Sequence, residues 1–381
     1  MGPVSVALVA SASSTAEGWE AVLSGAATGP VAALKRWGLW VASLAYGIGC
    51  RWHRMSYRLG LKRSFRLPVP VISVGNLTAG GTGKTPMVAW VAGHLRQEGV
   101  MATILSRGYG AIDGTTNDEA LVLADLCPDV PHLQGPDRVL MGLTAIGELG
   151  ASVLVLDDGF QHHRLAKDLE IVLVDATCPW GHGHLLPRGL LREPRATLRL
   201  ADAVILTRCD QVNPRALASL KAQVERLAPG KPILASTHQP ASLTRLGADP
   251  LPAEWLKGRN VAAFCGLGRP AAFKGTLEAS GARVVAWREF PDHHAYGRDD
   301  IRSLREWAES LPEGTPVICT HKDLVKIQLS ELGGRPLYRL DIVLELQDPS
   351  GVLPGLVEPL ARRAREIEEE RDDQLDEEMA P

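Results

Sequence analysis

A glycine-rich stretch that ends in Lys84 and Thr85 carries the clearest chemistry in this sequence. Residues 71–86 read VISVGNLTAGGTGKTP, a β-branched run followed by a loop with three glycines. Glycines let successive backbone N–H groups point at one anion, a lysine neutralises phosphate charge, and a threonine hydroxyl is a typical magnesium ligand. The stretch therefore predicts a cradle for nucleotide phosphates, formed by Thr78, Ala79, Gly80, Gly81, Thr82, Gly83, Lys84 and Thr85.

The match to the phosphate-loop pattern G-x-x-x-x-G-K-[ST] is incomplete, because Thr78 stands at the first glycine position. The order of elements fits nevertheless, since an apolar strand precedes the loop and a helix is expected to start near Pro86. The positive end of that helix would face the phosphates. A glycine-rich turn that binds nothing is the alternative, and the order of strand, loop, Lys-Thr and helix favours the phosphate site.

A second segment delivers two adjacent carboxylates at the end of an apolar run. Residues 153–163 read VLVLDDGFQHH, so Asp157 and Asp158 follow a predicted strand. In a doubly wound sheet the carboxyl end of such a strand adjoins the phosphate loop. We therefore expect at least one of the two to hold Mg²⁺ opposite Thr85, while the other could cap a helix.

Two further segments combine acids with a histidine. Residues 105–119 (LSRGYGAIDGTTNDE) end in Asp118 and Glu119, and residues 290–296 (FPDHHAY) place Asp292 beside His293. An aspartate near a transferred phosphoryl group can orient an acceptor hydroxyl and take its proton, and a histidine beside an acid is a better proton acceptor. From the residues alone, Asp118 and Glu119 fit the first turn of a helix equally well, and His293 fits a solvated loop.

These residues need strands to position them, and the apolar pattern supplies the strands. Short apolar runs occur at residues 71–74, 102–105, 153–156, 171–174 and 204–206, and again at 261–264, 284–287 and 316–319 beyond a proline- and loop-rich region at 239–254. Runs that alternate with helical patterns indicate a doubly wound, mostly parallel sheet with a second, smaller α/β domain. The final charge run, EIEEERDDQLDEEM, predicts a solvated or disordered tail.

Residues 37–50 (WGLWVASLAYGIGC) carry no charge, but the run is shorter than the roughly 20 residues that span a bilayer. Aromatic residues and a series of basic residues follow or interleave with it: Arg51, Arg54, Arg58, Lys62, Arg63 and Arg66. This composition is typical of a helix that lies in a membrane surface and faces anionic headgroups. A core helix with a solvated basic end is the alternative.

The overall composition excludes several classes. With 381 residues and 45% hydrophobic content, the chain can bury a large core and favours two domains. A formal net charge of -3 gives no general attraction to nucleic acid. The six cysteines never form a C-x-x-C pair, which argues against a zinc site or a disulfide framework. The start of the chain has no positive region before its apolar run, so we expect no cleaved signal peptide.

Taken together, these segments resemble the lipid A tetraacyldisaccharide 4′-kinase family of membrane-associated P-loop kinases. The resemblance covers most of the chain. It is carried in order by SVGNLTAGGTGKTP, LSRGYG followed by NDE, VLDDGFQHH, GHGHLLPRGLLREP (181–194), ADAVILTRCD, AFCGLGRP (263–270), FPDHHAY and THKDLVK (320–326).

The resemblance implies transfer of the γ-phosphate of ATP, with Mg²⁺, to the 4′-hydroxyl of the lipid A disaccharide 1-phosphate precursor. It implies work at the cytoplasmic face of the inner membrane, with no nucleic acid and no obligate protein partner. We expect five segments: an extension (1–29), a membrane-associating helical segment (30–66), a P-loop kinase domain (67–238), a smaller α/β domain (245–347) and a helical, acidic tail (348–381). The extension and the acidic tail lie outside the resemblance. We expect the domains that bear Lys84 and His293 to close and exclude water.

The resemblance also assigns roles to matching residues. Lys84 and Thr85 match the phosphate lysine and the magnesium hydroxyl, and Asp157 and Asp158 match paired acids near the metal. Asp118 matches the family's proposed base, which works with His293. Glu119 matches the adjacent acid, which we group with the metal site. Tyr109 matches a residue associated with the acceptor sugar, and Arg107 at the same strand end is a further expected substrate contact.

The chain departs from the family in one segment. The family usually shows G-N-G and P-A-G-P-L-R-E-P, where this chain has GHG at 181–183 and PRGLLREP at 187–194. Arg192 still matches, and Arg188 is added. Both are candidate contacts to an anionic group of the acceptor.

Two other functions remain as alternatives. Residues 207–210 (TRCD) follow a strand much as an N-K-x-D guanine motif would, although the asparagine and lysine are missing, so a GTP-dependent switch or metallochaperone is one alternative. A non-catalytic, ATP-binding membrane scaffold is the other. Comparison of ATP with GTP as donor, and a search for labelled phosphate in a lipid product, would separate these from a kinase.

Overall fold

The computed structural model describes residues 19, 21–108, 118–268 and 270–379, and these residues form two compact units. The described residues up to 108, together with 123–237 and 344–379, form unit 1, whereas 118–122 and 238–343 form unit 2. This division places 118–122 outside the expected domain 67–238, and it places 344–347 outside the expected domain 245–347. The segment that begins with Asp118 therefore belongs with unit 2.

Unit 1 is built on a parallel sheet. Its strands, in spatial order, are β7 (Ile233–Thr244), β6 (Ala203–Thr207), β5 (Leu169–Asp175), β1 (Val71–Asn76), β4 (Val153–Asp157), β2 (Ala102–Ser106) and β3 (His132–Gln134). β1 pairs in parallel with β4 on one side and with β5 on the other. Since the chain winds outward in both directions from β1, the carboxyl end of β1 lies at the position where such sheets bind ligands. The α/β fold with a mostly parallel sheet is confirmed.

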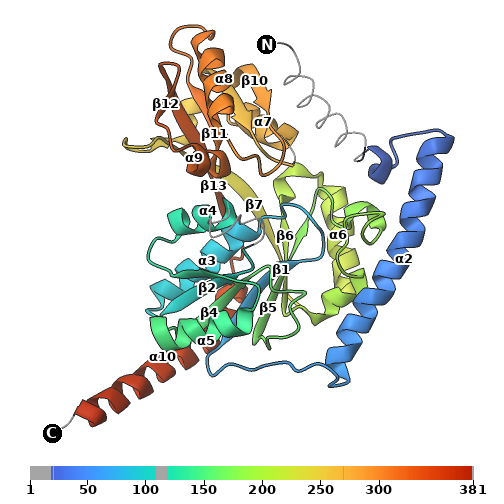
Figure 1. Ribbon diagram of the computed structural model, residues 1–381, viewed down its shortest axis with the longest axis vertical. Coiled ribbons are helices and arrows are strands. Elements are labelled where there is room, and N and C mark those ends of the chain that lie inside the picture. The colour runs from blue at the N-terminus through green and yellow to red at the C-terminus, as the bar shows by residue number, and fades with distance from the viewer. Residues whose placement is uncertain (1–18, 20, 109–117, 269, 380–381) are drawn as a thin grey trace. The chain divides into compact units, whose positions relative to one another are not determined.

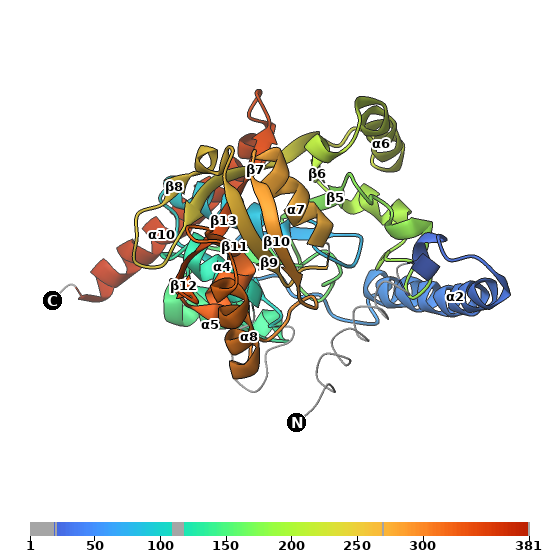
Figure 2. The same cartoon turned by 90° about the horizontal axis from the view of Figure 1, so that it is seen from above.

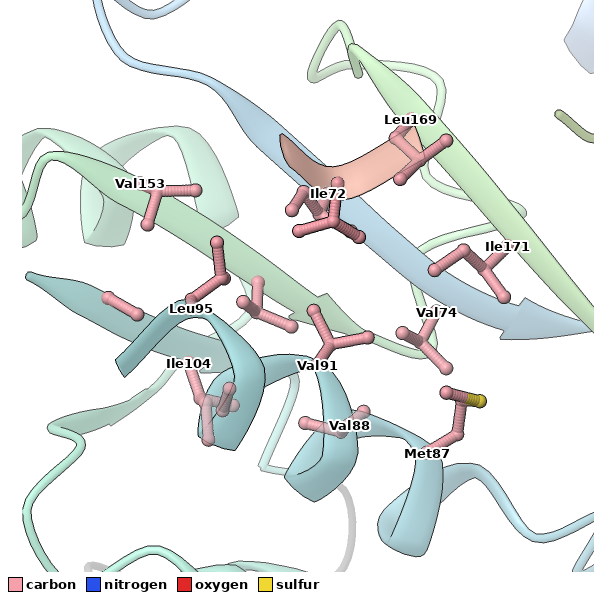
Figure 3. Packing of buried hydrophobic residues seen from close by; sticks show 14 of the residues in the cluster. Ile72, Val74, Met87, Val88, Val91, Leu95, Ile104, Val153, Leu169 and Ile171 are labelled. Carbon is pink, nitrogen blue, oxygen red and sulfur yellow. The ribbon is translucent and has the colours of Figure 1, made fainter. Parts of the chain in front are cut away.

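Helix α3 (Lys84–Gln97) fixes the end of the phosphate loop because one of its faces is buried against this sheet. Met87, Val88, Val91 and Leu95 pack among strand residues in one core cluster (Figure 3). Full burial of an aliphatic side chain of this size stabilises a fold by about 1.5–3 kcal/mol. The loop that precedes α3 therefore leads into a firmly anchored helix.

The C-terminal residues form helix α10 (Val352–Met379) in unit 1. Leu353, Val357, Ala361 and Ala364 recur at helical spacing and are buried in the same core cluster as α3. The charge run that we expected to be solvated or disordered continues this helix, and it keeps contacts with unit 1: Glu368 accepts a hydrogen bond from the backbone N–H of Met101 at 2.8 Å. Further helices of unit 1 are α5 (Arg138–Leu149) and α6 (Pro214–Leu227).

The N-terminal helical segment forms α2 (Pro30–Arg58), which stands apart from the sheet of unit 1 in Figures 1 and 2. Tyr46 donates a hydrogen bond from its hydroxyl to the carbonyl of Arg192 at 3.1 Å, and Arg54 pairs with Glu193 at 2.6 Å. Within the described residues, no helix combines the length and apolar character that a membrane span requires.

Unit 2 has a smaller parallel sheet in the order β10 (Arg283–Glu289), β9 (Asn260–Cys265), β11 (Val317–Thr320) and β13 (Arg335–Gln347). Short antiparallel strands β8 (Leu251–Pro252) and β12 (Glu331–Leu332) pair with β7 and β13. Its helices are α7 (Pro270–Ala279), α8 (Arg298–Glu309) and α9 (His321–Ile327), and α4 (Asp118–Leu126) begins in it. The region 239–254, which we expected to be loop, instead continues β7 to Thr244 and contains β8.

Candidate active site

The phosphate loop follows β1 directly and ends at α3. Gly80 and Gly83 have φ values of 102° and 88°, in the left-handed region that glycine adopts without strain. Gly83 is the N-cap of α3, so Lys84 and Thr85 are its first residues. Among the described residues, no backbone carbonyl accepts a hydrogen bond from the backbone N–H groups of residues 80–85. These amides lie at a helix N-terminus, where anions bind favourably, and the anion cradle itself stays a prediction.

Side chains from neighbouring strands brace this loop. Asn76 donates from its amide to the Thr82 hydroxyl at 2.8 Å, and the Thr207 hydroxyl donates to the Thr82 carbonyl at 2.9 Å. Arg208 donates to the Gly81 carbonyl at 2.7 Å and also pairs with Asp175. The TRCD segment, which suggested a guanine-binding alternative, therefore holds the phosphate loop through hydrogen bonds to its backbone.

The first two residues of the predicted cradle have a different role. The N–H of Ala79 donates to the carbonyl of Leu190 at 2.7 Å, and Thr78 pairs with Leu191 in an antiparallel bridge. The N–H of Arg192 donates in turn to the Leu77 carbonyl at 2.7 Å. Because residues 190–192 pair with the loop in this strand-like way, the amides that remain for an anion begin at Gly80 rather than at Thr78.

The two adjacent acids lie beside the loop, because β4 neighbours β1 and Asp157 is in register with Val74. Asp158 follows the strand with a left-handed φ of 55°. Its Oδ2 accepts a hydrogen bond from Arg192 at 2.6 Å, and its Oδ1 lies 3.6 Å from the Lys84 ammonium. Burial pushes the pKa of Asp158 upward, but the attraction of Lys84 and Arg192 outweighs it, and the pKa lies below its usual value. Asp158 is therefore a carboxylate anion held between two cations.

The donor set here suits magnesium. The Thr85 hydroxyl and the Asp157 carboxylate are buried, and Oδ1 of Asp158 is a buried oxygen that accepts no hydrogen bond. Mg²⁺ prefers such oxygen ligands and usually keeps phosphate oxygens and waters in its shell. Within the part of the chain that the structure describes, no group of three or more His, Cys, Asp or Glu residues could hold a metal by itself. A magnesium ion at this site would therefore depend on the nucleotide for further ligands.

Arg138, which the sequence analysis missed, approaches the same acids. Its side chain is 5% exposed and donates to the carbonyl of Asp157 at 2.9 Å. Burial lowers the pKa of this guanidinium, and the charges of Asp158 and Asp157 oppose that change. The sequence around it shows only an aspartate N-cap, Asp137, before a helix. The sequence around an arginine at a helix start does not indicate that its side chain contacts the end of a strand further along the chain.

The other predicted substrate residues have varied positions. Arg188 donates to the carbonyl of Leu23 at 2.8 Å, so it holds the N-terminal segment. Arg192 contacts Asp158, as described above, rather than standing free for an acceptor anion. Arg107 is exposed just after β2. Tyr109 lies outside the described residues.

Unit 2 brings Asp118 and His293 together, although 175 positions separate them in the sequence. Nδ1 of His293 lies 3.1 Å from Oδ2 of Asp118. Partial burial pushes the pKa of Asp118 upward, but hydrogen bonds from His293 and Lys326 prevail, and its pKa lies below the usual value. The hydrogen bond with Asp118 raises the pKa of His293 against the effect of burial. This pair can accept a proton and share its charge.

Two lysines of α9, absent from the predicted site, complete this cluster. Lys326 Nζ lies 2.5 Å from Oδ2 of Asp118, and Lys322 Nζ lies 3.7 Å from Oε1 of Glu119. The two lysines are four residues apart, on one face of the helix. Glu119 thus forms an ion pair in unit 2, and its assignment to the metal site stays a prediction.

Comparison with known proteins follows this geometry. Residues 35–356 match the family model LpxK, described as Tetraacyldisaccharide-1-P 4′-kinase. A tetraacyldisaccharide 4′-kinase of Syntrophus aciditrophicus is 40% identical over 332 residues, which cover 81% of this chain and 88% of the relative. One of Anaeromyxobacter dehalogenans is 42% identical over 356 residues, which cover 88% and 93%.

A solved structure agrees with these matches. The crystal structure of the "apo" form of LpxK from Aquifex aeolicus in complex with ATP superimposes with a TM-score of 0.70 and 32% identity, over 85% of this chain and 99% of that chain. The resemblance seen in the sequence is confirmed, and with it the kinase class and the fold. This chain belongs to the tetraacyldisaccharide 4′-kinase family.

Proposed function

We propose that this chain transfers the γ-phosphate of ATP to the 4′-hydroxyl of a tetraacyldisaccharide 1-phosphate in lipid A synthesis, with the residues of the two units in the roles below. Family membership makes the chain an ATP-dependent kinase of this kind. The observation that carries the residue assignment is the glycine-rich loop that ends in Lys84 at the start of α3. The relative of known structure was solved with ATP, which supports nucleotide binding by the same loop here.

Unit 1 binds and neutralises the phosphates in this proposal. The amides of residues 80–85 and the Lys84 ammonium contact the β- and γ-phosphates, because both lie at the N-terminus of α3. The Thr85 hydroxyl, Asp157 and Asp158 are the residues that would hold Mg²⁺, and the ion would offset the negative charge that develops on the phosphates. Arg192 keeps Asp158 ionised and fixes its orientation.

Asp118 of unit 2 acts on the acceptor. As the bond between the 4′-oxygen and the γ-phosphorus forms, the bond from that phosphorus to the β,γ-bridging oxygen breaks and ADP leaves. The hydroxyl proton passes to the carboxylate of Asp118. His293 donates a hydrogen bond to this carboxylate and orients it. The transition state of phosphoryl transfer is loose, so the attacking hydroxyl needs little activation by a strong base. A carboxylate with a low pKa can therefore act here, mainly by orienting the hydroxyl. The closure of the two domains stays a prediction.

The direct test follows phosphate into lipid. Purified protein is incubated with Mg²⁺, γ-labelled ATP and detergent-dispersed disaccharide 1-phosphate, and the label is expected on the distal sugar. Asp118→Asn should lower kcat by roughly 10²–10⁴-fold, the usual contribution of a general base, with ATP binding retained. Bound ATP without a labelled lipid would favour the scaffold alternative, and a preference for GTP would favour the switch.

We further propose that α2 lies in the cytoplasmic surface of the inner membrane, where the acylated acceptor resides. Leu34, Trp37, Ile48 and Trp52 are 68%, 64%, 70% and 67% exposed, whereas Tyr46 and Arg54 on the other face contact residues 192–193. An exposed apolar stripe beside basic residues is typical of a helix that lies in a bilayer surface.

Vesicle flotation tests this membrane proposal. The double variant Trp37→Ser, Ile48→Ser should lose most binding to vesicles that contain anionic lipid, because both side chains leave the apolar stripe. Leu143→Ser, which alters a leucine on α5 that is 51% exposed, is the control and should bind like the unaltered protein. Equal flotation of all three proteins would contradict a membrane role for α2.

A further inference from the structure

The ammonium of Lys326 contacts Asp118 and the loop that carries His293. It lies 2.5 Å from Oδ2 of Asp118 and donates at 3.0 Å to the carbonyl of His294, the residue after His293. Its side chain is 11% exposed. One buried cation therefore links the acid to the loop that carries the histidine.

The element that presents Lys326 is itself fixed. The carboxylate of Asp323, fully buried in the first turn of α9, accepts hydrogen bonds from the Thr320 hydroxyl at 2.6 Å, from the Tyr296 hydroxyl at 2.8 Å and from the Gly266 N–H at 3.1 Å. Burial and the Asp323 charge raise the pKa of Tyr296 far above its usual range, so this hydroxyl stays a donor. Tyr296 belongs to the same loop as His293, so α9 and this loop are joined at two points, Asp323 and Lys326.

The contacts on Asp118 fall on one oxygen. Both His293 Nδ1 and Lys326 Nζ approach Oδ2, at 3.1 Å and 2.5 Å. Among the residues that the structure describes, Oδ1 receives no hydrogen bond. Two donors on one oxygen fix the plane of the carboxylate, and they leave the other oxygen as the acceptor for a hydroxyl.

We propose that Lys326 is a positioning residue for the transfer reaction, which orients Asp118 so that Oδ1 meets the acceptor hydroxyl. The inference rests on the proposed role of Asp118 as the base. Lys326 acts through Asp118 and through the backbone of His294, and does not itself touch the reacting atoms. Two segments remote in sequence thereby hold one carboxylate.

A double-variant comparison separates this role from a merely structural one. The charged groups around Asp118 are Asp292 and His293 of the loop, Lys322 and Lys326 of α9, and Glu119 of its own helix. Because Lys326 acts through Asp118, its removal should lower activity little further once Asp118 has been replaced by Asn. A structural role that is independent of Asp118 would lower activity in both backgrounds.

The experiment measures kcat and KM for the lipid and for ATP in the full chain. Lys326→Met should lower kcat by on the order of 10–100-fold, as expected when a catalytic group is misplaced by a fraction of an ångström to 1 Å, and should leave both KM values nearly unchanged. Lys326→Arg, which keeps a cation and a donor, should recover most of that kcat. Lys231→Met removes a lysine that pairs with Asp202 at 3.3 Å and is the matched control.

The outcomes are distinct. An equal loss with and without the Asp118 carboxylate would overturn the inference and leave Lys326 as a structural residue, as would an unaltered kcat in Lys326→Met. If Lys326→Met does not fold, judged by its thermal transition, Lys326→Gln replaces it. If Asp118→Asn transfers phosphate as fast as the unaltered protein, the proposed base itself fails. If Asp118→Asn loses activity while Lys326→Met keeps its kcat, only the role of Lys326 fails.

Discussion

The phosphate loop of unit 1 and the Asp118 cluster of unit 2 are assembled in opposite ways. The loop takes its amides, its lysine and its threonine from consecutive residues between Gly80 and Thr85, and strand and helix on either side fix its course. The cluster takes one residue each from α4, a loop after β10 and α9. In the proposed function, nucleotide binding would depend on a contiguous motif, whereas the chemistry on the acceptor would depend on tertiary structure.

The two regions also differ in solvent exposure. The side chain of Lys84 is 10% exposed, whereas that of His293 is 56% exposed. Water and salt screen charge interactions at exposed positions and leave buried ones much stronger. Changes in the loop should therefore have larger effects than changes at the rim of the cluster.

Beside Asp118→Asn, the next largest effect in this comparison is expected for Lys84→Met. Loss of a preorganised cation at the developing phosphate charge should lower kcat by roughly 10²–10³-fold and weaken ATP binding. Radiolabel transfer and equilibrium ATP binding measure the two parts, with Lys231→Met as the control for loss of a lysine. Normal ATP binding together with a loss of phosphate transfer to the lipid would contradict the assignment of the loop to nucleotide binding.

A smaller effect is expected for Arg208→Ala. This change removes the hydrogen bond to the Gly81 carbonyl and leaves the buried Asp175 without its arginine. A hydrogen bond to a charged group contributes about 1.5 kcal/mol, so KM for ATP should rise about tenfold while KM for the lipid stays unchanged. An unaltered KM for ATP would mean that Asn76 and Thr207 suffice to hold the loop.

The smallest effect concerns stability and pH. The pKa of His293 is raised in the folded chain by Asp118, so this pair stabilises the fold fully below about pH 6.5, the unfolded value. The contribution is lost as the pH rises through the folded pKa. Melting temperatures of the unaltered protein and His293→Ala should therefore differ more at pH 5.5 than at pH 9, by an amount equivalent to less than about 1 kcal/mol, because the pair is half exposed. A difference that did not vary with pH would show that no charge is involved.

The sequence predicted the parts of the fold that repeat a strong local pattern. The five predicted strands of the first series correspond to β1, β2, β4, β5 and β6, all of them apolar and largely buried. β7 was missed, because Pro240 and polar neighbours resemble a loop, and Pro is rare inside a sheet. A helical tail was expected at 348–381, but its contacts with the core were missed because its polar composition hides the buried spacing that begins at Leu353.

In the candidate site, too, the residues of a local motif were predicted, and the residues that only folding brings together were not. The motif around Lys84 and the acids after β4 were found from residue types alone, whereas the pairing of Asp118 with His293 came only from the resemblance to a family. Lys326 and Arg138 were not predicted, because a lone basic residue on a helix gives no sign of its partner. Only the folded chain brings Lys326 to 2.5 Å from Asp118.

The position of Asp158 between Lys84 and Arg192 has a consequence for how the enzyme loads its donor. Asp158 is the counter-ion of Lys84 in this structure. Phosphates that bind Lys84 must therefore compete with the carboxylate of Asp158, which repels them. A divalent cation held by Asp158 would supply the positive charge that offsets this repulsion. We therefore expect nucleotide and ion to enter as one complex, and free ATP in a chelator to be held poorly by a loop that is otherwise intact.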